Sequence, residues 1–136
     1  MPFNVQDAGL IRSKALPAAA ATAYTAAIDL GARSGKQDHV AEMEFEVSVP
    51  ATPDLVEAKT IIIDIQTDDD VEWGSAKTII DNIITVTGQA AAAGGLAASE
   101  RFRVPTNVER YIRAAATVLT AGGDNTAVSF TLKALF

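Results

Sequence analysis

Residues 41–49, AEMEFEVSV, alternate strictly between apolar and polar side chains. A period of two over this length predicts a strand, because successive side chains of a strand point to opposite faces of its sheet. One face would be buried, and the other would carry Glu42, Glu44 and Glu46 into water. The prolines at positions 50 and 53 end the pattern, since proline cannot donate to a sheet ladder.

The same alternation recurs further along the chain. Residues 59–67, KTIIIDIQT, place three isoleucines on one side, and β-branched side chains pack well on a pleated surface. A less regular pattern also predicts a strand near the N-terminus. The predicted strands outside residues 41–49 cover residues 22–30, 59–67, 83–87 (alone or with a second short strand before it in 77–82), 101–104, 109–119 and 126–136.

Residues 107–118, NVERYIRAAATV, permit two interpretations. The alanines favour a helix that would carry Arg110, Tyr111 and Arg113 as a binding site. Alternation instead places Ile112, with the small or branched residues at 114, 116 and 118, on one face. A Gly-Gly-Asp-Asn turn and a clearly alternating strand follow, so we predict that this segment is one arm of a hairpin.

The remaining segments show no period. Residues 1–16 predict an extended, irregular N-terminal arm, residues 67–76 a loop, and residues 88–99, GQAAAAGGLAAS, a low-complexity loop. Seven or eight short strands without a firm helix predict an all-β fold. The expected architecture is an antiparallel β-sandwich or jelly roll, built as a single domain over residues 1–136.

Composition narrows the function classes. Of the 136 residues, 49% are hydrophobic, which suffices for a core, and none is cysteine, which excludes disulfides and thiolate chemistry. The net charge of −6 argues against nucleic acid and anionic membrane surfaces as partners. No apolar run reaches the ~20 residues of a membrane span, and the alanine-rich stretch after Pro17 is too weakly hydrophobic for a signal peptide, so we expect a soluble protein.

Candidate chemistry is sparse. His39 is the single histidine, so neither a Ser-His-Asp triad nor a nitrogen- or sulfur-ligated metal site is expected. Asp68, Asp69 and Asp70 could offer oxygen ligands to calcium, but the spacing of an EF-hand is missing and a solvated acidic turn is favoured. Trp73 beside them suits a sugar-stacking platform or, more often, an anchor in a core or interface. We therefore expect no enzyme, no metal and no cofactor.

Four arginines lie within thirteen positions of an otherwise acidic chain, at 101, 103, 110 and 113. Two compatible interpretations carry equal weight. The arginines pair with carboxylates on neighbouring strands, or they contact a second copy or another partner, where arginine is enriched. Either way, the alternation predicts a basic face separate from the acidic face of residues 41–49.

The order of features in residues 60–136 resembles a known family. An isoleucine-rich strand ends in QTDDD, a tryptophan loop and a Gly/Ala-rich loop follow, and RFRVP leads to RYIR, a Gly-Gly turn and a last strand. This resembles the capsid cement (decoration) proteins of tailed bacteriophages, especially the jelly-roll type of a Bordetella podovirus and its relatives. Arg110 and Tyr111 match the pair that opens the penultimate strand in that family, and Gly122 and Gly123 match its turn.

The resemblance implies a structural virion protein. It would bind the outside of a phage head, which is assembled in the bacterial cytoplasm, and bridge neighbouring subunits of the major capsid protein. Self-association is implied too, with a homodimer favoured and a homotrimer as the alternative. A carbohydrate- or host-surface-binding module centred on Trp73 is the rival hypothesis.

Exposure and residue type select the candidate contact residues. Those expected to touch the capsid are Phe3, Leu10, Ile11, Arg12, Pro50, Pro53, Leu55, Asp68, Asp69, Asp70 and Trp73. Those expected to support the sheet or the contact between copies are Arg101, Arg103, Arg110, Tyr111 and Arg113.

Overall fold

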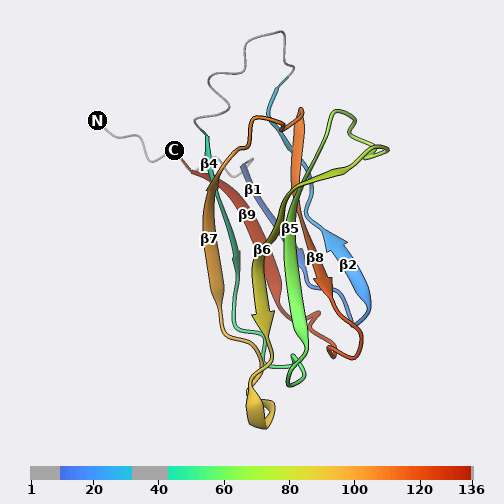
Figure 1. The fold of residues 1–136 in the computed structure, drawn as a ribbon, viewed down its shortest axis with the longest axis vertical. Coiled ribbons are helices and arrows are strands. Elements are labelled where there is room, and N and C mark those ends of the chain that lie inside the picture. The colour runs from blue at the N-terminus through green and yellow to red at the C-terminus, as the bar shows by residue number, and fades with distance from the viewer. Residues whose placement is uncertain (1–9, 32–42, 136) are drawn as a thin grey trace, which may run out of the picture.

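Two antiparallel sheets packed face to face make up the computed structural model, which describes residues 10–31 and 43–135 (Figure 1). The four-stranded sheet has the order β1 (Ile11–Ala15), β9 (Ser129–Leu135), β4 (Glu44–Val49) and β7 (Ala98–Arg103). The five-stranded sheet has the order β2 (Ala21–Tyr24), β8 (Tyr111–Val118), β5 (Thr60–Asp68) and β6 (Lys77–Thr87), with β3 (Ile28–Asp29) also paired to β8. Within the described residues, the helical residues are Leu10 and a short 3-10 turn, η2 (Ala90–Ala92). The predicted β-sandwich is confirmed.

The strand order is that of a jelly roll. Both β2 and β3 pair with β8, so together they act as one interrupted strand. The pairs β1·β9 and β4·β7 lie in one sheet, whereas β2·β8 and β5·β6 lie in the other. This alternation results when one long hairpin is rolled up so that successive strand pairs join opposite sheets.

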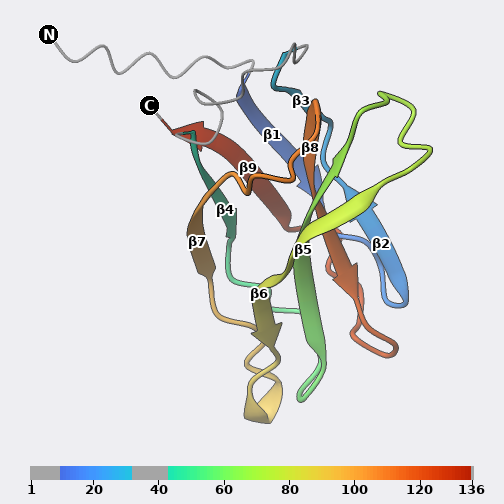
Figure 2. The same cartoon turned by 45° about the horizontal axis from the view of Figure 1, so that its top comes forward.

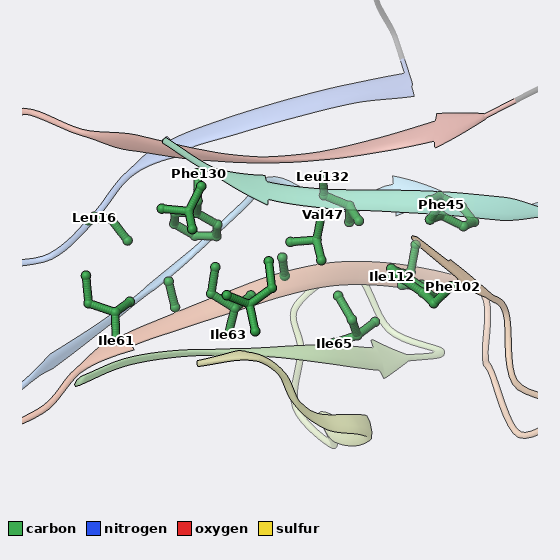
Figure 3. Close-up of a cluster of buried hydrophobic side chains, with 14 of the residues drawn as sticks. Leu16, Phe45, Val47, Ile61, Ile63, Ile65, Phe102, Ile112, Phe130 and Leu132 are labelled. Atoms are coloured by element: carbon green, nitrogen blue, oxygen red, sulfur yellow. The ribbon is translucent and has the colours of Figure 1, made fainter. Parts of the chain in front are cut away.

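The core lies between the two sheets (Figure 3). In the four-stranded sheet Phe45, Phe130 and Leu132 are fully buried, and they face the buried row of Ile61 and Ile63 from β5 (Figure 3). The rings of Phe45 and Phe102 stack with centroids 5.7 Å apart. Each buried aliphatic or aromatic side chain of this kind contributes roughly 1.5–3 kcal/mol to folding.

The alanine-rich segment that could have been a helix or a strand is strand β8. Residues Tyr111–Val118 form a strand flanked by β2 and β5, and the side chains of Ala114 and Ala116 are completely buried. The predicted strand is confirmed, but the predicted hairpin with the last strand is wrong. Strand β9 lies in the other sheet, because the chain crosses from one sheet to the other after β8.

Several boundaries also differ from expectation, among them the start of β7 at Ala98, within the predicted loop 88–99. Residues 11–15 of the predicted arm form β1, an edge strand paired with β9. The predicted strand 22–30 is broken between β2 and β3, where the Thr25 hydroxyl accepts a 3.0 Å hydrogen bond from the Ala114 amide in place of a backbone partner. Residues 77–87 form one strand, interrupted by a register shift near Asn82 with φ of 53°.

Four connections gather at one end of the sandwich, which we call the loop end: residues 16–20, 50–59, 88–97 and 119–128. Backbone hydrogen bonds join them, including Thr52 to Gly95 and Val56 to Gly122. The β6–β7 connection, coloured gold, projects beyond its neighbours (Figures 1 and 2). The β5–β6 connection leaves the sandwich at the opposite end (Figure 2).

Candidate functional site

The outer face of the five-stranded sheet carries the most concentrated group of aromatic and charged side chains. Register places Gln66 of β5 directly opposite Arg113 of β8, and Tyr24 of β2 opposite Ala115. Because side chains two apart on a strand share a face, Tyr24, Gln66 and Arg113 all project outward from the same area of the sheet.

Arg113 packs against two aromatic rings. Its Cζ atom lies 3.9 Å from the centroid of the Tyr24 ring and 3.9 Å from the centroid of the Trp73 ring. Trp73 comes from the β5–β6 connection, which brings the indole back over the sheet, and it has a φ of 57°. A bulky residue rarely adopts this left-handed conformation. We call the group formed by Tyr24, Gln66, Trp73 and Arg113 the arginine stack.

The side-chain amide of Gln66 binds the edge of the Arg113 guanidinium that is formed by Nε and Nη2. Arg113 Nε and Nη2 donate hydrogen bonds of 3.0 and 2.8 Å to Gln66 Oε1. Within the described part of the chain, Arg113 forms no salt bridge. Partial burial lowers the pKa of Arg113, although Asp68 acts against that shift from a distance. The stack therefore holds a partly desolvated cation without a directly paired carboxylate.

Trp73 is thus not a free platform. The ring face that it turns to Arg113 is covered by the guanidinium, and the same is true of Tyr24. A sugar could not stack on either of these faces. Only the faces turned away from Arg113 remain for the sugar-platform interpretation.

The acidic loop beside the stack is ordered by Asp68. This carboxylate is fully buried and accepts hydrogen bonds from the amides of Asp70 (3.0 Å) and Ser75 (2.8 Å). These donors, Asp70 foremost, lower the pKa of Asp68. The prediction that Asp68 contacts a partner is corrected, because its side chain is sequestered in shaping the loop. Asp69 and Asp70 are exposed, as predicted.

Three carboxylates converge next to this loop. Oxygen atoms of Asp68, Asp69 and Glu109 lie within 4.8 Å of one another. The ammonium of Lys77 pairs with Glu109, so a cation from the chain itself already compensates part of this charge. Acidic groups arranged this way do not by themselves indicate a metal ion.

The other arginines that were predicted together are distributed over both sheets. Arg110 donates two hydrogen bonds, of 3.0 and 2.9 Å, to the Asp29 carboxylate, which lowers the pKa of Asp29, and its guanidinium lies 5.1 Å from the ring centroid of Tyr111. Arg101 lies 3.2 Å from Glu46 on the outer face of the four-stranded sheet.

Glu46 links two strands there, because Lys133 also approaches it, at 3.1 Å. The Lys133 hydrogen bond, followed by that of Arg101, lowers the pKa of Glu46. Arg103 is opposite Glu44 in the register. The predicted separation of acidic and basic faces is therefore wrong, since β4 and β7 place both charges side by side. Pairing within the chain is confirmed for Arg101 and Arg110.

The loop end forms a second candidate contact region. Leu96 is 70% exposed, and Val56 and Leu119 are each more than 40% exposed there. No charged residue occurs in residues 88–97. Pro50 and Pro53 are exposed as predicted, but Leu55 is buried, so the prediction that Leu55 contacts a partner is corrected.

Close backbone approach makes the loop end rigid. A Cβ atom on Gly88 would lie 2.0 Å from the Val56 carbonyl oxygen, and one on Gly94 would lie 2.4 Å from that of Thr52. Only glycine permits such contact. Two open hollows, of about 360 and 320 Å³, flank this end, and neither is lined by a histidine or a carboxylate.

The remaining candidate residues lie outside the arginine stack and the loop end, or outside the residues that the structure describes. Ile11 and Arg12 belong to β1, where Arg12 Nε donates a 3.1 Å hydrogen bond to the Ala27 carbonyl. Leu10 immediately precedes that strand and is partly buried against the core. Phe3 and His39 fall outside the described residues.

Two residues of the arginine stack escaped sequence analysis. Tyr24 and Gln66 each lie more than 40 positions from Arg113. The sequence shows only that Tyr24 is a large aromatic residue, and Gln66 an amide, on the outward side of a predicted strand. Leu96 had a clearer signal, as the one large apolar side chain in residues 88–99.

No protein-family model and no curated protein matches this chain. Within the described residues, no helix is long and apolar enough to span a membrane.

Proposed function

We propose that this chain is a capsid cement protein. It binds the outside of a tailed-phage head and bridges neighbouring subunits of the major capsid protein, and it associates with itself, as a dimer rather than a trimer. It carries out no catalysis and uses no cofactor.

The observation that carries this proposal is the presence of two separate candidate contact regions on one small sandwich. The arginine stack occupies the outer face of the five-stranded sheet. The loop end, where Leu96, Val56 and Leu119 are exposed beside charged residues such as Asp54 and Glu57, occupies one pole. Bridging requires two such regions held at a fixed distance, whereas a catalyst needs one cleft with converging reactive groups. The jelly roll supplies a rigid spacer between them.

The composition of both regions suits protein contacts. Tryptophan, tyrosine and arginine dominate the energetic centres of protein interfaces, and the stack contains all three. Exposed apolar residues grouped on rigid loops mark association sites as well. In a closed lattice many copies bind at once, so each interface can be modest in area.

The resemblance noted for residues 60–136 adds support. Tyr111 begins the penultimate strand and Arg110 immediately precedes it, while Gly122 and Gly123 lie in the connection to the last strand. These are the positions that the family pattern assigns to its Arg-Tyr pair and its glycine turn.

Sedimentation velocity tests the proposal. The purified chain is run alone and together with shells assembled from the cognate major capsid protein. Co-sedimentation at a constant ratio of chain to shell subunit is expected, and the free species gives the oligomeric state. A chain that sediments at the rate of its free form in the presence of shells would contradict the cement function.

A further inference from the structure

Arg113 differs from the other arginines of the sheets in how its charge is compensated. Arg101 and Arg110 are more open to solvent, and each reaches a carboxylate directly. Arg113 packs against two rings, yet its only direct polar partner in the described residues is the neutral amide of Gln66. Asp68 attracts this cation only from a distance, so a partly buried guanidinium lacks a directly bonded carboxylate. A carboxylate supplied from outside would reduce the cost of its burial.

The geometry defines what kind of group can approach. The rings of Tyr24 and Trp73 both pack against the guanidinium, with centroids 3.9 Å from Cζ, and Gln66 accepts the hydrogen bonds of the edge formed by Nε and Nη2. Nη1 makes no hydrogen bond to any described residue. The open approach is therefore in the guanidinium plane, toward Nη1 and the second hydrogen of Nη2. Two parallel donors in one plane match the two oxygens of a carboxylate.

The surroundings favour a carboxylate on a protein over one on a sugar or a polyanion. The inner ring faces on which a sugar would stack are filled by the guanidinium itself. The chain's net charge of −6 repels polyanions, but a single carboxylate that meets one arginine is compensated locally. Tyr24 remains 42% exposed and provides an apolar rim for a partner surface.

We propose that Arg113 is a binding residue for the carboxylate of an aspartate or glutamate on the docking partner. This inference rests on the proposed function, because that partner is the shell protein. Tyr24 and Trp73 hold the guanidinium in one orientation. The donors on Nη1 and Nη2 are therefore already in position before the partner binds. Preorganisation of this kind reduces the entropy lost on binding.

The sharpest test is Gln66→Glu, which places a carboxylate beside Nε and Nη2 of Arg113. The internal ion pair would stabilise the folded chain and at the same time compensate the charge that the partner needs. We expect a more stable chain in urea unfolding and shell binding weakened about ten- to a hundredfold, the range for a hydrogen bond to a charged group. A stabilised variant that binds shells as well as the original chain would overturn the proposal.

Two matched substitutions separate binding from a loss of charge or of fold. Arg113→Gln should weaken shell binding about ten- to a hundredfold and flatten its dependence on salt, because one charged contact is lost. Lys14→Gln removes the same charge from an exposed site on β1 of the other sheet and should change binding less than threefold. Equal effects of the two variants would show that only net charge matters, and would overturn the proposal.

A titration without shells separates this inference from the proposed function. Capped Gly-Glu-Gly and Gly-Gln-Gly peptides, and glucuronic acid, are added while the Arg113 Nε–H and Trp73 indole N–H signals are followed by NMR. The inference predicts saturable shifts with the glutamate peptide only, absent in Gln66→Glu. If the original chain ignores shells but shows these shifts, the cement function fails and the carboxylate site stands. Shifts with glucuronic acid alone, or with none of the three, would overturn the assignment to a protein carboxylate.

Discussion

Left-handed backbone conformations concentrate at the loop end. Seven described residues other than glycine have positive φ, and five of them are alanines of this region: Ala20, Ala58, Ala91, Ala92 and Ala121. The left-handed region is unfavourable by roughly 1–2 kcal/mol for a residue with a Cβ atom. Strain of this kind persists only where neighbouring contacts hold the backbone in place, and it is common at binding sites.

Replacing one such alanine with glycine should relieve strain. Ala121 is exposed with φ of 62°. We expect Ala121→Gly to raise the free energy of unfolding by about 0.5–1 kcal/mol, measured by urea denaturation, since the gain exceeds the added entropy of the unfolded chain. Ala127→Gly, at an exposed turn position without positive φ, is the control and should lower it. Two equally destabilised variants would contradict a left-handed Ala121.

The charge on Asp64 should lower the free energy of unfolding at neutral pH, whereas the charge on an ordinary paired carboxylate raises it. Burial, together with the nearby Asp81, raises the pKa of Asp64, although the Asn82 amide donates a 2.7 Å hydrogen bond to it. A folded pKa above the unfolded one means that the charged form destabilises the fold at neutral pH. That penalty disappears as pH falls through the raised pKa.

We therefore expect Asp64→Asn to be more stable than the original chain at pH 7, with a difference that shrinks toward pH 3. The asparagine oxygen can still accept the Asn82 hydrogen bond, so the gain isolates the charge. Urea unfolding at several pH values measures it. A difference that grows as the pH is lowered would contradict this account.

At the scale of elements, β8 shows why small residues occupy a central strand. Ala114 and Ala116 project into the core, and Ala115, on the outer face, is also buried. Alanine has a low strand propensity, so its presence here reflects space and not local preference. Packing between the sheets overrides propensity.

Enlarging one of these alanines should be unfavourable even though the new residue suits a strand better. Ala116→Leu is expected to lower the free energy of unfolding by about 1–3 kcal/mol, because a filled core has to shift around it. Ala21→Val, at an exposed position of β2, is the control and should change stability by less than about 0.5 kcal/mol. Thermal and urea unfolding measure both, and a stabilised Ala116→Leu would indicate an unfilled cavity beside β8.

Alternation was enough to locate most strands, because a period of two is visible in the local sequence. It succeeded for Glu44–Val49, Thr60–Asp68 and Ser129–Leu135, where large apolar residues mark the buried face. It could not reveal that β8 and β9 lie in different sheets, since a tight turn and a crossover contain the same glycines. Strand pairing depends on residues far apart in sequence.

The arginine stack was hidden for the same reason. Arg113 and Trp73 were both recognised as candidates, but as members of different groups. Tyr24 and Gln66 join them only after β2, β5 and β8 have paired. Asp68 was misjudged because three consecutive aspartates do not reveal which one turns inward.

At the scale of the whole molecule, the fold keeps two unlike surfaces apart. The arginine stack is polar and aromatic. The loop end combines an uncharged stretch, residues 88–97, with charged residues on the neighbouring connections, and close glycine contacts hold these connections together. Under the proposed function, this arrangement would hold two neighbouring shell subunits at a fixed separation.

Charge placed on the loop end should abolish its part in docking while leaving the fold intact. Leu96→Asp is expected to weaken shell binding at least tenfold, because a carboxylate would be buried in an apolar contact. Its free energy of unfolding should change by no more than about 0.5 kcal/mol, as is usual for an exposed position. Ser13→Asp adds the same charge to the outer face of the four-stranded sheet, away from the loop end, and should bind normally. Unchanged binding by Leu96→Asp would remove the loop end from the contact surface.

The proposed function requires that two separate surfaces of this sandwich attach it to a shell. Amide hydrogen exchange of the chain, free and bound to shells, tests that claim most directly. Slower exchange on binding is predicted in residues 50–58, 88–97 and 119–124 and, separately, in residues 69–76 beside the arginine stack. Protection confined to one of these regions, or to the outer face of the four-stranded sheet, would contradict the claim.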